Sequence, residues 1–296
     1  MKMKLAILGG DQRQVYMARQ LADRGHQTYI WGLGACEEEV GQAVVCNGWE
    51  TAVNASEAVI LPMPVSSDGV RVHCPLLSED RFLRIPALLD ALDGRLLLGG
   101  RFSEALRGIA ESRGVRWIDY YESEVLKLRN ALPTAEGAIA IAMKELPVTL
   151  GGSATAVIGY GRIGSLLADK LRDLGMQVTV FARRSEQLTD AVLHRHSVYK
   201  MTCKNRSRLA EAIPANCRVL FNTVPYRLFS KEQLERLPRG CVLIDLASAP
   251  GGIDHTAAAQ LGIKSIWATA LPGRHTPESA GVIIADVIEE ILSELD

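Results

Sequence analysis

The 296-residue chain is predicted to be an α/β protein with two doubly wound, Rossmann-like domains and a cleft between them. Three observations predict this fold. Short apolar runs alternate with longer segments of helical period, which indicates parallel β-α-β units with helices on both faces of a sheet. A glycine fingerprint follows an apolar strand near the middle of the chain. The length suits two domains of roughly 100–200 residues each.

The first domain is expected to span residues 1–130, as a flavodoxin-like or Rossmann-like substrate domain. Its strands are expected at 4–10, 26–32, 58–62, 95–100 and 114–119. Its helices are expected at Val15–Arg24, near 79–92 and near 102–113. Asp11 is the expected N-cap of the first helix. Arg13 then either presents a cation to a carboxylate ligand or is a solvated residue of the first helical turn.

The second domain is expected to span residues 131–274 and to bind the cofactor. Its first helix is predicted over Thr134–Leu146, with Thr134 as N-cap and Glu136 in the first turn. Its strands are expected at 154–159, 177–182, 218–223, 241–246 and 264–268. Helices are expected at Arg162–Leu174, near 231–237 and near 254–261. A long amphipathic helix, Pro277–Leu295, is expected to pack back on the first domain, which therefore includes about residues 275–296.

The glycine fingerprint runs from Gly159 to Gly164 (GYGRIG) between a predicted strand and a predicted helix. Gly159 permits a tight turn, Gly161 lets the backbone approach a pyrophosphate, and Gly164 lets helix and strand pack closely. The helix that opens at Arg162 and Ile163 would hold the phosphates on its N-terminus. The alternative is a glycine-rich turn without a ligand.

The end of the next strand bears on the choice of cofactor. A carboxylate there would bind the ribose 2′-hydroxyl of NAD, but the chain has Arg183, Arg184 and Ser185 and no acid before Glu186. A guanidinium pairs with phosphate through a planar fork of donors, so NADP is favoured and NAD remains the alternative. Alternatively, one arginine stacks on the adenine and the other is solvated.

Two further loops follow predicted strands at the edge where ligands bind in open α/β sheets. They are expected to line the nicotinamide end of the cofactor, with turn residues as the alternative interpretation. Their candidate residues are Asn222, Thr223, Val224 and Pro225 in the first loop, and Leu246 and Ala247 in the second.

The composition excludes several classes of protein. There are 33 Lys+Arg against 34 Asp+Glu, a net charge of −1, which argues against nucleic acid as a main partner. No apolar run approaches the roughly 18–20 residues of a membrane span. The 6 cysteines form no Cys-x-x-Cys pair, and no histidine lies at zinc-finger spacing from them. We therefore expect small buried thiols, no metal site and a cytoplasmic location.

Several blocks of sequence together resemble the family of dipicolinate synthase A subunits, over essentially the whole chain. Besides the glycine fingerprint, they are GGDQRQ at 9–14, NALPTAEGAI at 130–139, FNTVP at 221–225, IDLASAPGG at 244–252, ALPG at 270–273 and TPESAG at 276–281. The fingerprint is common to many dehydrogenases, whereas the other blocks in this order are far more specific. The chain departs from the family pattern at Arg274-His275, and residues 63–78 do not align clearly, which leaves the roles of His73 and His275 open.

The resemblance implies an NAD(P)-dependent oxidoreductase that makes pyridine-2,6-dicarboxylate from 4-hydroxy-tetrahydrodipicolinate during sporulation. It also implies a partner, the B subunit of dipicolinate synthase, and a location in the mother-cell cytoplasm of a sporulating bacterium. The cofactor site and the long last helix permit a homodimer as well. No nucleic-acid or membrane partner is expected.

This reaction asks for cations that hold a small dicarboxylate and for a group that moves protons. The candidates are Arg13 and the helix N-terminus near Thr134 for binding, and Glu136 for proton transfer. Glu136 would otherwise simply complement the helix dipole. Two other functions remain open: a 2-hydroxyacid or shikimate-type dehydrogenase, and a non-catalytic NADP(H)-sensing subunit that activates a partner. For the former, His275 would need a paired carboxylate, and the sequence identifies none.

Overall fold

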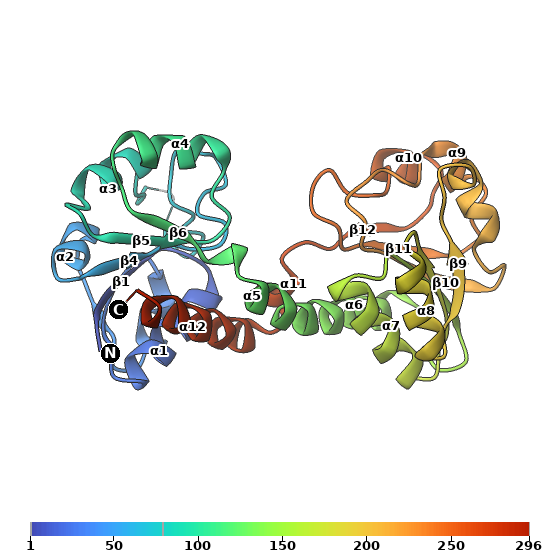
Figure 1. The fold of residues 1–296 in the computed structure, drawn as a ribbon, viewed down its shortest axis with the longest axis horizontal. Coiled ribbons are helices and arrows are strands. Elements are labelled where there is room, and N and C mark those ends of the chain that lie inside the picture. Colours follow the sequence, from blue (N-terminus) through green and yellow to red (C-terminus); the bar gives the residue numbers. More distant parts are fainter. Residues whose placement is uncertain (1, 79, 296) are drawn as a thin grey trace. The chain divides into compact units, whose positions relative to one another are not determined.

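The computed structural model describes residues 2–78 and 80–295. The chain divides into two compact units, of which unit 1 comprises Met1–Asn130 with Thr276–Asp296 and unit 2 comprises Ala131–His275. Each unit contains a six-stranded sheet whose paired strands all run parallel (Figure 1). The predicted fold class, α/β with two Rossmann-like domains, is confirmed.

The sheet of unit 1 has the strand order β3-β2-β1-β4-β5-β6. Its strands are β1 (Lys4–Leu8), β2 (Gln27–Trp31), β3 (Val44–Val45), β4 (Ala58–Ile60), β5 (Leu96–Gly99) and β6 (Trp117–Asp119). Its α-helices are α1 (Gln12–Asp23), α2 (Trp49–Asn54), α3 (Ile85–Ala91), α4 (Glu104–Ser112), α5 (Glu124–Arg129) and α12 (Pro277–Ser293). This is the strand order of a Rossmann sheet, and the order reverses between β1 and β4, where such sheets bind ligands.

Helices cover both faces of this sheet. Helices α1 and α12 lie on one face, and α2, α3 and α4 lie on the other (Figure 1). Close approach of α12 to α1 depends on Gly281, because a Cβ there would stand 2.6 Å from the carbonyl oxygen of Arg13. The predicted return of the last helix to the first domain is therefore confirmed.

The sheet of unit 2 has the order β12-β11-β10-β7-β8-β9, which is again the Rossmann order. Its strands are β7 (Ala154–Ile158), β8 (Gln177–Ala182), β9 (Ser197–Lys200), β10 (Cys217–Asn222), β11 (Val242–Asp245) and β12 (Ser265–Trp267). Its α-helices are α6 (Ala131–Glu145), α7 (Arg162–Asp173), α8 (Ser185–Leu193), α9 (Lys231–Leu234), α10 (His255–Gln260) and α11 (Leu271–His275). The order reverses between β7 and β10.

The predicted helix start at Thr134 is wrong. Helix α5 ends at Arg129, its C-cap Asn130 keeps right-handed helical angles, and α6 begins directly afterwards at Ala131. Pro133 fits the first turn of α6, where a missing N–H costs nothing, so it does not break the helix. Thr134 is thus inside α6 and is not an N-cap, and Glu136 lies beyond the first turn. The helix N-terminus proposed near Thr134 for binding a carboxylate instead lies at Ala131, directly after the end of α5.

The helix predicted near 79–92 is also shorter than expected. It begins only at Ile85, with Pro86 in its first turn, while Arg84 pairs with Arg71 in an antiparallel bridge. Glu79, where the predicted helix began, lies outside the described residues.

Candidate functional site

The glycine turn after β7 has the geometry of a dinucleotide site. A Cβ at Gly159 would stand 2.3 Å from the Thr223 hydroxyl oxygen, and one at Gly164 would stand 2.2 Å from the carbonyl oxygen of Gly159. These glycines therefore let β7, α7 and the loop after β10 pack closely. At Gly161, by contrast, a Cβ would meet no heavy atom of the described chain within 4 Å. The backbone at Gly161 thus faces open space, as an approaching pyrophosphate requires.

Gly161 is also the N-cap of α7, and it has no side chain to bond the N–H groups of the first turn. The first-turn N–H groups at Arg162, Ile163 and Gly164 belong to a 12-residue helix whose dipole favours an anion at this end. The predicted residues therefore fit the phosphates of a dinucleotide.

Cationic side chains gather where β8 ends. Arg183 and Arg184 are exposed, and in the described parts of the chain no carboxylate forms an ion pair with either. Ser185 opens α8, and its hydroxyl accepts a hydrogen bond from Lys200 Nζ at 3.0 Å. Lys200 ends the edge strand β9, opposite Ala182 in register. No sequence pattern indicates Lys200 as a site residue, because β9 is mostly exposed and has no apolar run.

A buried amide–carboxylate pair shapes the loops after β10 and β11. Asn222 Nδ2 donates to Asp245 Oδ1 at 2.7 Å, and both residues are fully buried. Asp245 Oδ2 accepts the backbone N–H groups of Gly252 at 2.7 Å and Ile253 at 3.1 Å. The Asp245 carboxylate is therefore bound by protein groups on both oxygens, which fixes both loops.

The predicted residues of these loops play different parts. The Thr223 hydroxyl donates to the Ile158 carbonyl at 2.9 Å, so it joins β10 to β7. Leu246 and Ala247 are buried, and Pro225 is exposed beside the half-buried Val224. Asp245 was missed by sequence reasoning, although an acid that ends an apolar strand is a signal that could have found it.

Arg13 lies at the carboxyl end of β1 in unit 1 and is 5% exposed. Its Nε and Nη2 each bond the Asp11 carboxylate at 2.9 Å, and Nη2 also donates to the Met63 carbonyl at 2.6 Å. Burial alone would raise the pKa of Asp11, but the bonds and charge of Arg13 outweigh it and lower this pKa. Arg13 is therefore not a solvated residue, and it forms an ion pair with Asp11. Asp11 is the N-cap of α1, as predicted.

The loop of residues 63–84 covers the point where the strand order of unit 1 reverses. Gly10 N–H donates to the His73 carbonyl at 2.8 Å, and a Cβ at Gly9 would stand 2.3 Å from Cys74 Sγ. A Cβ at Gly34 would stand 2.0 Å from the Leu76 carbonyl oxygen. Residues 73–76 of this loop thus pack directly against the glycine turn after β1 and against Gly34.

Beside this loop lies a cavity of about 320 Å³, which we call the arginine cavity. Its chemistry comes from Ser67, Arg71, His73 and Arg81. The His73 ring is half-buried, and its Nδ1 lies 2.8 Å from the Ser67 hydroxyl. Burial lowers the pKa of His73, and the Arg13 charge adds to this while Asp11 opposes it.

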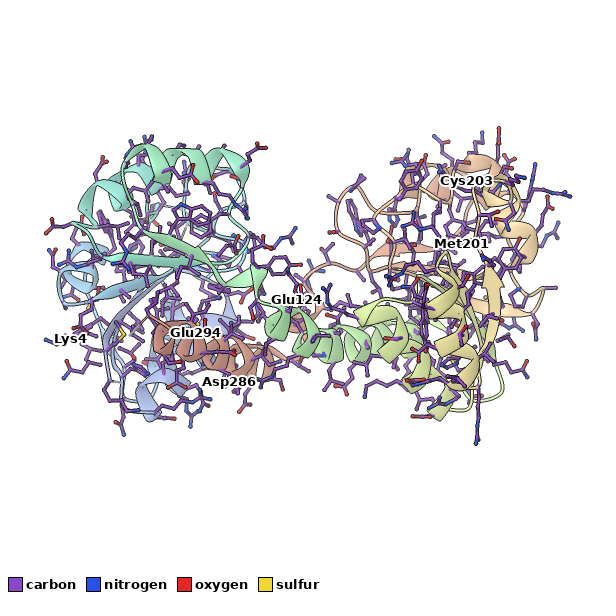
Figure 2. The ribbon with its side chains drawn as sticks, viewed as in Figure 1. Lys4, Glu124, Met201, Cys203, Asp286 and Glu294 are labelled. Atoms are coloured by element: carbon purple, nitrogen blue, oxygen red, sulfur yellow. The ribbon has the colours of Figure 1, made fainter. Side chains whose placement is uncertain are left out.

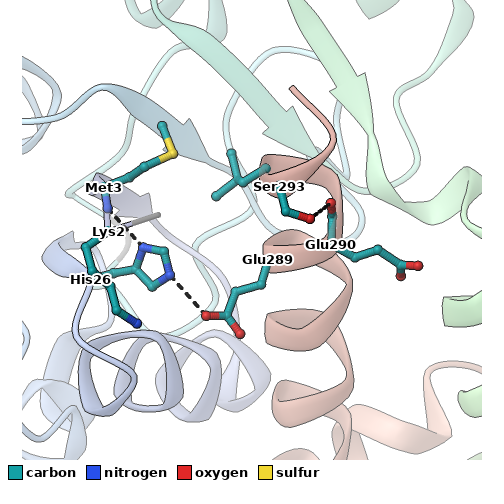
Figure 3. Close-up of a pocket in the computed structure, with 7 residues that line it drawn as sticks. Lys2, Met3, His26, Glu289, Glu290 and Ser293 are labelled. Carbon is teal, nitrogen blue, oxygen red and sulfur yellow. Dashed lines mark hydrogen bonds and ion pairs between the residues drawn. The ribbon is translucent and has the colours of Figure 1, made fainter. Parts of the chain in front are cut away.

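A second cavity of unit 1 lies at the opposite, amino end of β1 (Figure 3). There His26 Nδ1 accepts from the Met3 N–H at 3.3 Å, and Nε2 lies 3.1 Å from Glu289 Oε1. Because ligands of such sheets bind at the carboxyl ends of strands, we interpret this group as a structural tie between α12 and the start of the sheet.

Glu136 and His275 lie on the helices α6 and α11 of unit 2. Glu136 is exposed, and its Oε1 pairs with Lys170 Nζ at 3.0 Å. The His275 ring packs on α6, since a Cβ at Gly137 would stand 3.2 Å from its Cδ2. A late catalytic histidine would require a paired carboxylate, but across residues 2–78 and 80–295 no carboxylate pairs with His275.

A cluster of metal-ligating side chains and a membrane-spanning helix are both absent from the residues that the structure describes. No group of three or more His, Cys, Asp or Glu side chains among them could hold a metal ion. No helix in this part of the chain is long and apolar enough to cross a bilayer.

The Rossmann sheet of unit 2, its open glycine turn and its fixed loops are those of a nicotinamide-dependent oxidoreductase. Residues 129–261 indeed match the family model described as D-isomer specific 2-hydroxyacid dehydrogenase, NAD binding domain. Residues 4–121 match the family model described as the N-terminal domain of the dipicolinate synthase A subunit.

Known relatives extend this similarity to both units. The A subunit of dipicolinate synthase from Bacillus subtilis (strain 168) is 29% identical over 294 residues, which cover 99% of this chain and 97% of the relative. The solved structure of the dipicolinate synthase A subunit from Bacillus halodurans has a TM-score of 0.84 at 25% identity and covers 97% of both chains. That of the dipicolinate synthase A chain from Bacillus subtilis has a TM-score of 0.84 at 27% identity, over 99% of this chain and 97% of the other. The predicted resemblance to the A subunits of dipicolinate synthases is confirmed.

Proposed function

We propose that the chain is the A subunit of a dipicolinate synthase. It would convert 4-hydroxy-tetrahydrodipicolinate to pyridine-2,6-dicarboxylate with a nicotinamide cofactor. The observation that carries this proposal is the similarity to a dipicolinate synthase A subunit over 99% of the chain. The open glycine turn of unit 2 supports it independently, because it fits a dinucleotide.

The chemistry of the ring requires loss of water and removal of two electrons, and a bound nicotinamide would accept the electrons as hydride. The protein supplies binding and orientation. The N-terminus of α7 would hold the pyrophosphate, and Gly161 would let it approach. The loops fixed by Asn222 and Asp245 would hold the nicotinamide end in one position, which reduces the entropy lost on reaching a reactive geometry.

We propose NADP as the preferred cofactor. Arg183 and Arg184 supply guanidinium groups without carboxylate partners in the described chain, and the N-terminus of α8 at Ser185 adds backbone donors. Lys200 brings a third cation to the same place through its bond to Ser185. A 2′-phosphate satisfies this group of donors, whereas a 2′-hydroxyl leaves most of them unused.

The remaining parts of the proposal concern partners, place and catalysis. The B subunit of dipicolinate synthase is the proposed partner, with a homodimer as a further assembly, in the cytoplasm of the mother cell. Arg13 and Glu136 stay candidate catalytic residues. If Glu136 moves a proton, Glu136→Gln abolishes dipicolinate formation, whereas unchanged formation removes Glu136 from the mechanism.

The decisive experiment incubates the purified chain with NADP⁺ and with 4-hydroxy-tetrahydrodipicolinate, formed in the same mixture by the synthase that makes it in the lysine pathway, without the B subunit. We expect the ultraviolet absorbance of dipicolinate to appear together with NADPH. Cofactor binding without hydride transfer would instead favour a cofactor-sensing role. Turnover of a simple 2-hydroxy acid would favour the dehydrogenase alternative, with which the family match of residues 129–261 is also compatible.

A further inference from the structure

We infer that the arginine cavity of unit 1 binds the dicarboxylate, with Arg71 and Arg81 each holding one carboxylate group. This assignment rests on the proposed function for the identity of the ligand. It assigns the ligand to the chain's own residues in unit 1, at the carboxyl edge of the sheet.

Aromatic rings hold both guanidinium groups in place. The Arg71 guanidinium carbon lies 4.4 Å from the centre of the Phe82 ring, and that of Arg81 lies 5.7 Å from the centre of the Trp31 ring. A guanidinium that lies over a ring keeps its N–H donors, which point outward in its own plane, free for a planar carboxylate. In residues 2–78 and 80–295, no acidic side chain forms an ion pair with either arginine. Both therefore offer the fork of donors that carboxylates bind.

The loop that carries Arg71 is fixed by the backbone. Val72 N–H donates to the Leu83 carbonyl at 2.9 Å, and Ile85 N–H donates to the Val70 carbonyl at 3.0 Å. Asp68 also lines the cavity, but its Oδ1 already accepts the N–H groups of Val70 and Arg71 at 2.8 Å each. One oxygen of Asp68 is thus engaged by the turn, and the Arg71 charge adds to these bonds in lowering the pKa of Asp68. Arg71 and Arg81 both line the cavity, and each lies over an aromatic ring, which lowers the entropy cost of binding.

Size and the histidine favour a ring dicarboxylate. A volume of about 320 Å³ lies at the low end of the roughly 300–1,000 Å³ of small-molecule sites, which suits one substituted ring. In the tautomer in which the Ser67 hydroxyl donates to His73 Nδ1, the neutral ring has its proton on Nε2, where it can be donated to a ligand. Two forks and one further donor match two carboxylates on a ring better than a single anion.

The test measures binding of pyridine-2,6-dicarboxylate to the full chain by titration calorimetry in metal-free buffer, with and without NADP⁺. We expect the diacid to bind at least about tenfold more tightly than pyridine-2-carboxylate. Arg71→Met and Arg81→Met should each weaken diacid binding roughly ten- to hundredfold, since each removes charge-assisted hydrogen bonds.

The matched control is Arg84→Met. Arg84 also stacks on Phe82, with 5.8 Å between guanidinium carbon and ring centre, but does not line the cavity, so this variant should bind within about twofold of wild type.

Several results would overturn the assignment. The assignment fails if wild type does not bind the diacid with or without NADP⁺, or if both cavity variants bind it with wild-type affinity. It also fails if Arg84→Met loses as much diacid affinity as the cavity variants, or if inorganic phosphate competes for the site as well as the diacid does. NADP⁺ affinity, measured in parallel, shows that each variant is folded. If the cavity variants lose diacid binding but wild type forms no dipicolinate, the proposed function is refuted and the cavity assignment stands. If dipicolinate forms with an unchanged KM in both cavity variants, the cavity assignment is refuted and the proposed function stands.

Discussion

Gly161 and Gly164 belong to one turn, but they differ in the space that a side chain would find there. Gly161 has extended backbone angles and open space beside it, whereas a side chain at Gly164 would collide with the backbone at Gly159. We expect Gly161→Ala to leave the thermal unfolding temperature of the cofactor-free chain within about 2 °C of wild type, because nothing is displaced. It should nevertheless weaken cofactor binding about tenfold or more, because the new methyl group stands where the pyrophosphate approaches.

Gly164→Ala is the matched comparison for that experiment. Its methyl group would lie 2.2 Å from the Gly159 carbonyl oxygen, so helix and strand must separate and unit 2 should lose about 1–3 kcal/mol of stability. Calorimetry of both variants, with cofactor titrations, separates the effects. A Gly161→Ala variant that binds cofactor like wild type would show that the open space is not the dinucleotide site.

Arg183 and Arg184 allow a direct test of cofactor choice. The double variant Arg183→Ala, Arg184→Ala should weaken NADPH binding by at least about tenfold and NADH binding by less than about threefold, because only NADPH carries the 2′-phosphate. Fluorescence titration of the two reduced cofactors measures both affinities. Lys200→Met should likewise weaken NADPH binding more than NADH binding. Equal losses of affinity for the two cofactors would contradict the 2′-phosphate assignment.

At the level of single elements, α12 is tied to unit 1 by charge as well as by its apolar face. Arg24 pairs with Asp286 and Glu289 on α12, and Arg129 reaches Asp286 at 2.6 Å (Asp286 is labelled in Figure 2). Burial alone would raise the pKa of Glu289, but its bonds to Arg24 and His26 outweigh burial and lower this pKa below its usual value. The folded pKa is therefore lower than the unfolded one, and ionised Glu289 favours the folded state.

The sign of this shift gives a pH prediction. Glu289→Gln should lower the free energy of unfolding of unit 1 by about 1 kcal/mol at pH 7. This is the upper end of the stabilisation that ion pairs near the surface contribute. The stabilisation is complete above the unfolded pKa and is lost as the pH falls through the lowered folded pKa, so wild type and variant should converge only well below the usual glutamate pKa of about 4.3. Urea unfolding at stepwise pH values measures the difference. Glu290→Gln, an exposed neighbour on α12, should match wild type throughout.

Elements with strong apolar runs could be predicted, and those held by tertiary contacts could not. Strand β7 and helix α7 were predicted closely, because both carry a buried apolar face. Strand β3 has only two residues, both exposed, and β9 is mostly exposed, so neither offers a periodic signal. The continuity of α5 and α6 at Asn130 was missed because proline and threonine there resemble a helix start.

The candidate site divides in the same way. The glycine turn and Arg183 were predictable because their chemistry lies in one short stretch of sequence. Arg71 and Arg81 were not, because a backbone bridge and two aromatic rings bring them to one cavity. Such contacts leave no periodic pattern in the sequence.

In the molecule as a whole, each unit has its own cores, so ligand binding to one should stabilise that unit alone. We expect NADP⁺ at about 100 times its dissociation constant to add about 2.7 kcal/mol to unit 2, which raises its unfolding temperature by roughly 5–10 °C. Unit 1 should unfold at an unchanged temperature. Calorimetry with and without cofactor tests this.

Fluorescence assigns the transitions in that experiment. Trp31, Trp49 and Trp117 lie in unit 1 and Trp267 lies in unit 2, so the variant Trp267→Phe reports unit 1 alone. A cofactor-dependent shift of its fluorescence transition would mean that the units unfold together.

The return of the chain to unit 1 at Thr276 also sets an order of events during biosynthesis. Unit 2 is continuous in sequence, whereas unit 1 is completed only when α12 supplies Ile284, Val287 and Ile288 to its core. On the ribosome, the sheet of unit 1 must wait with part of one apolar face uncovered while the whole of unit 2 is synthesised. A chain interrupted in unit 2 would therefore display that face, which is the kind of surface that chaperones and proteases recognise.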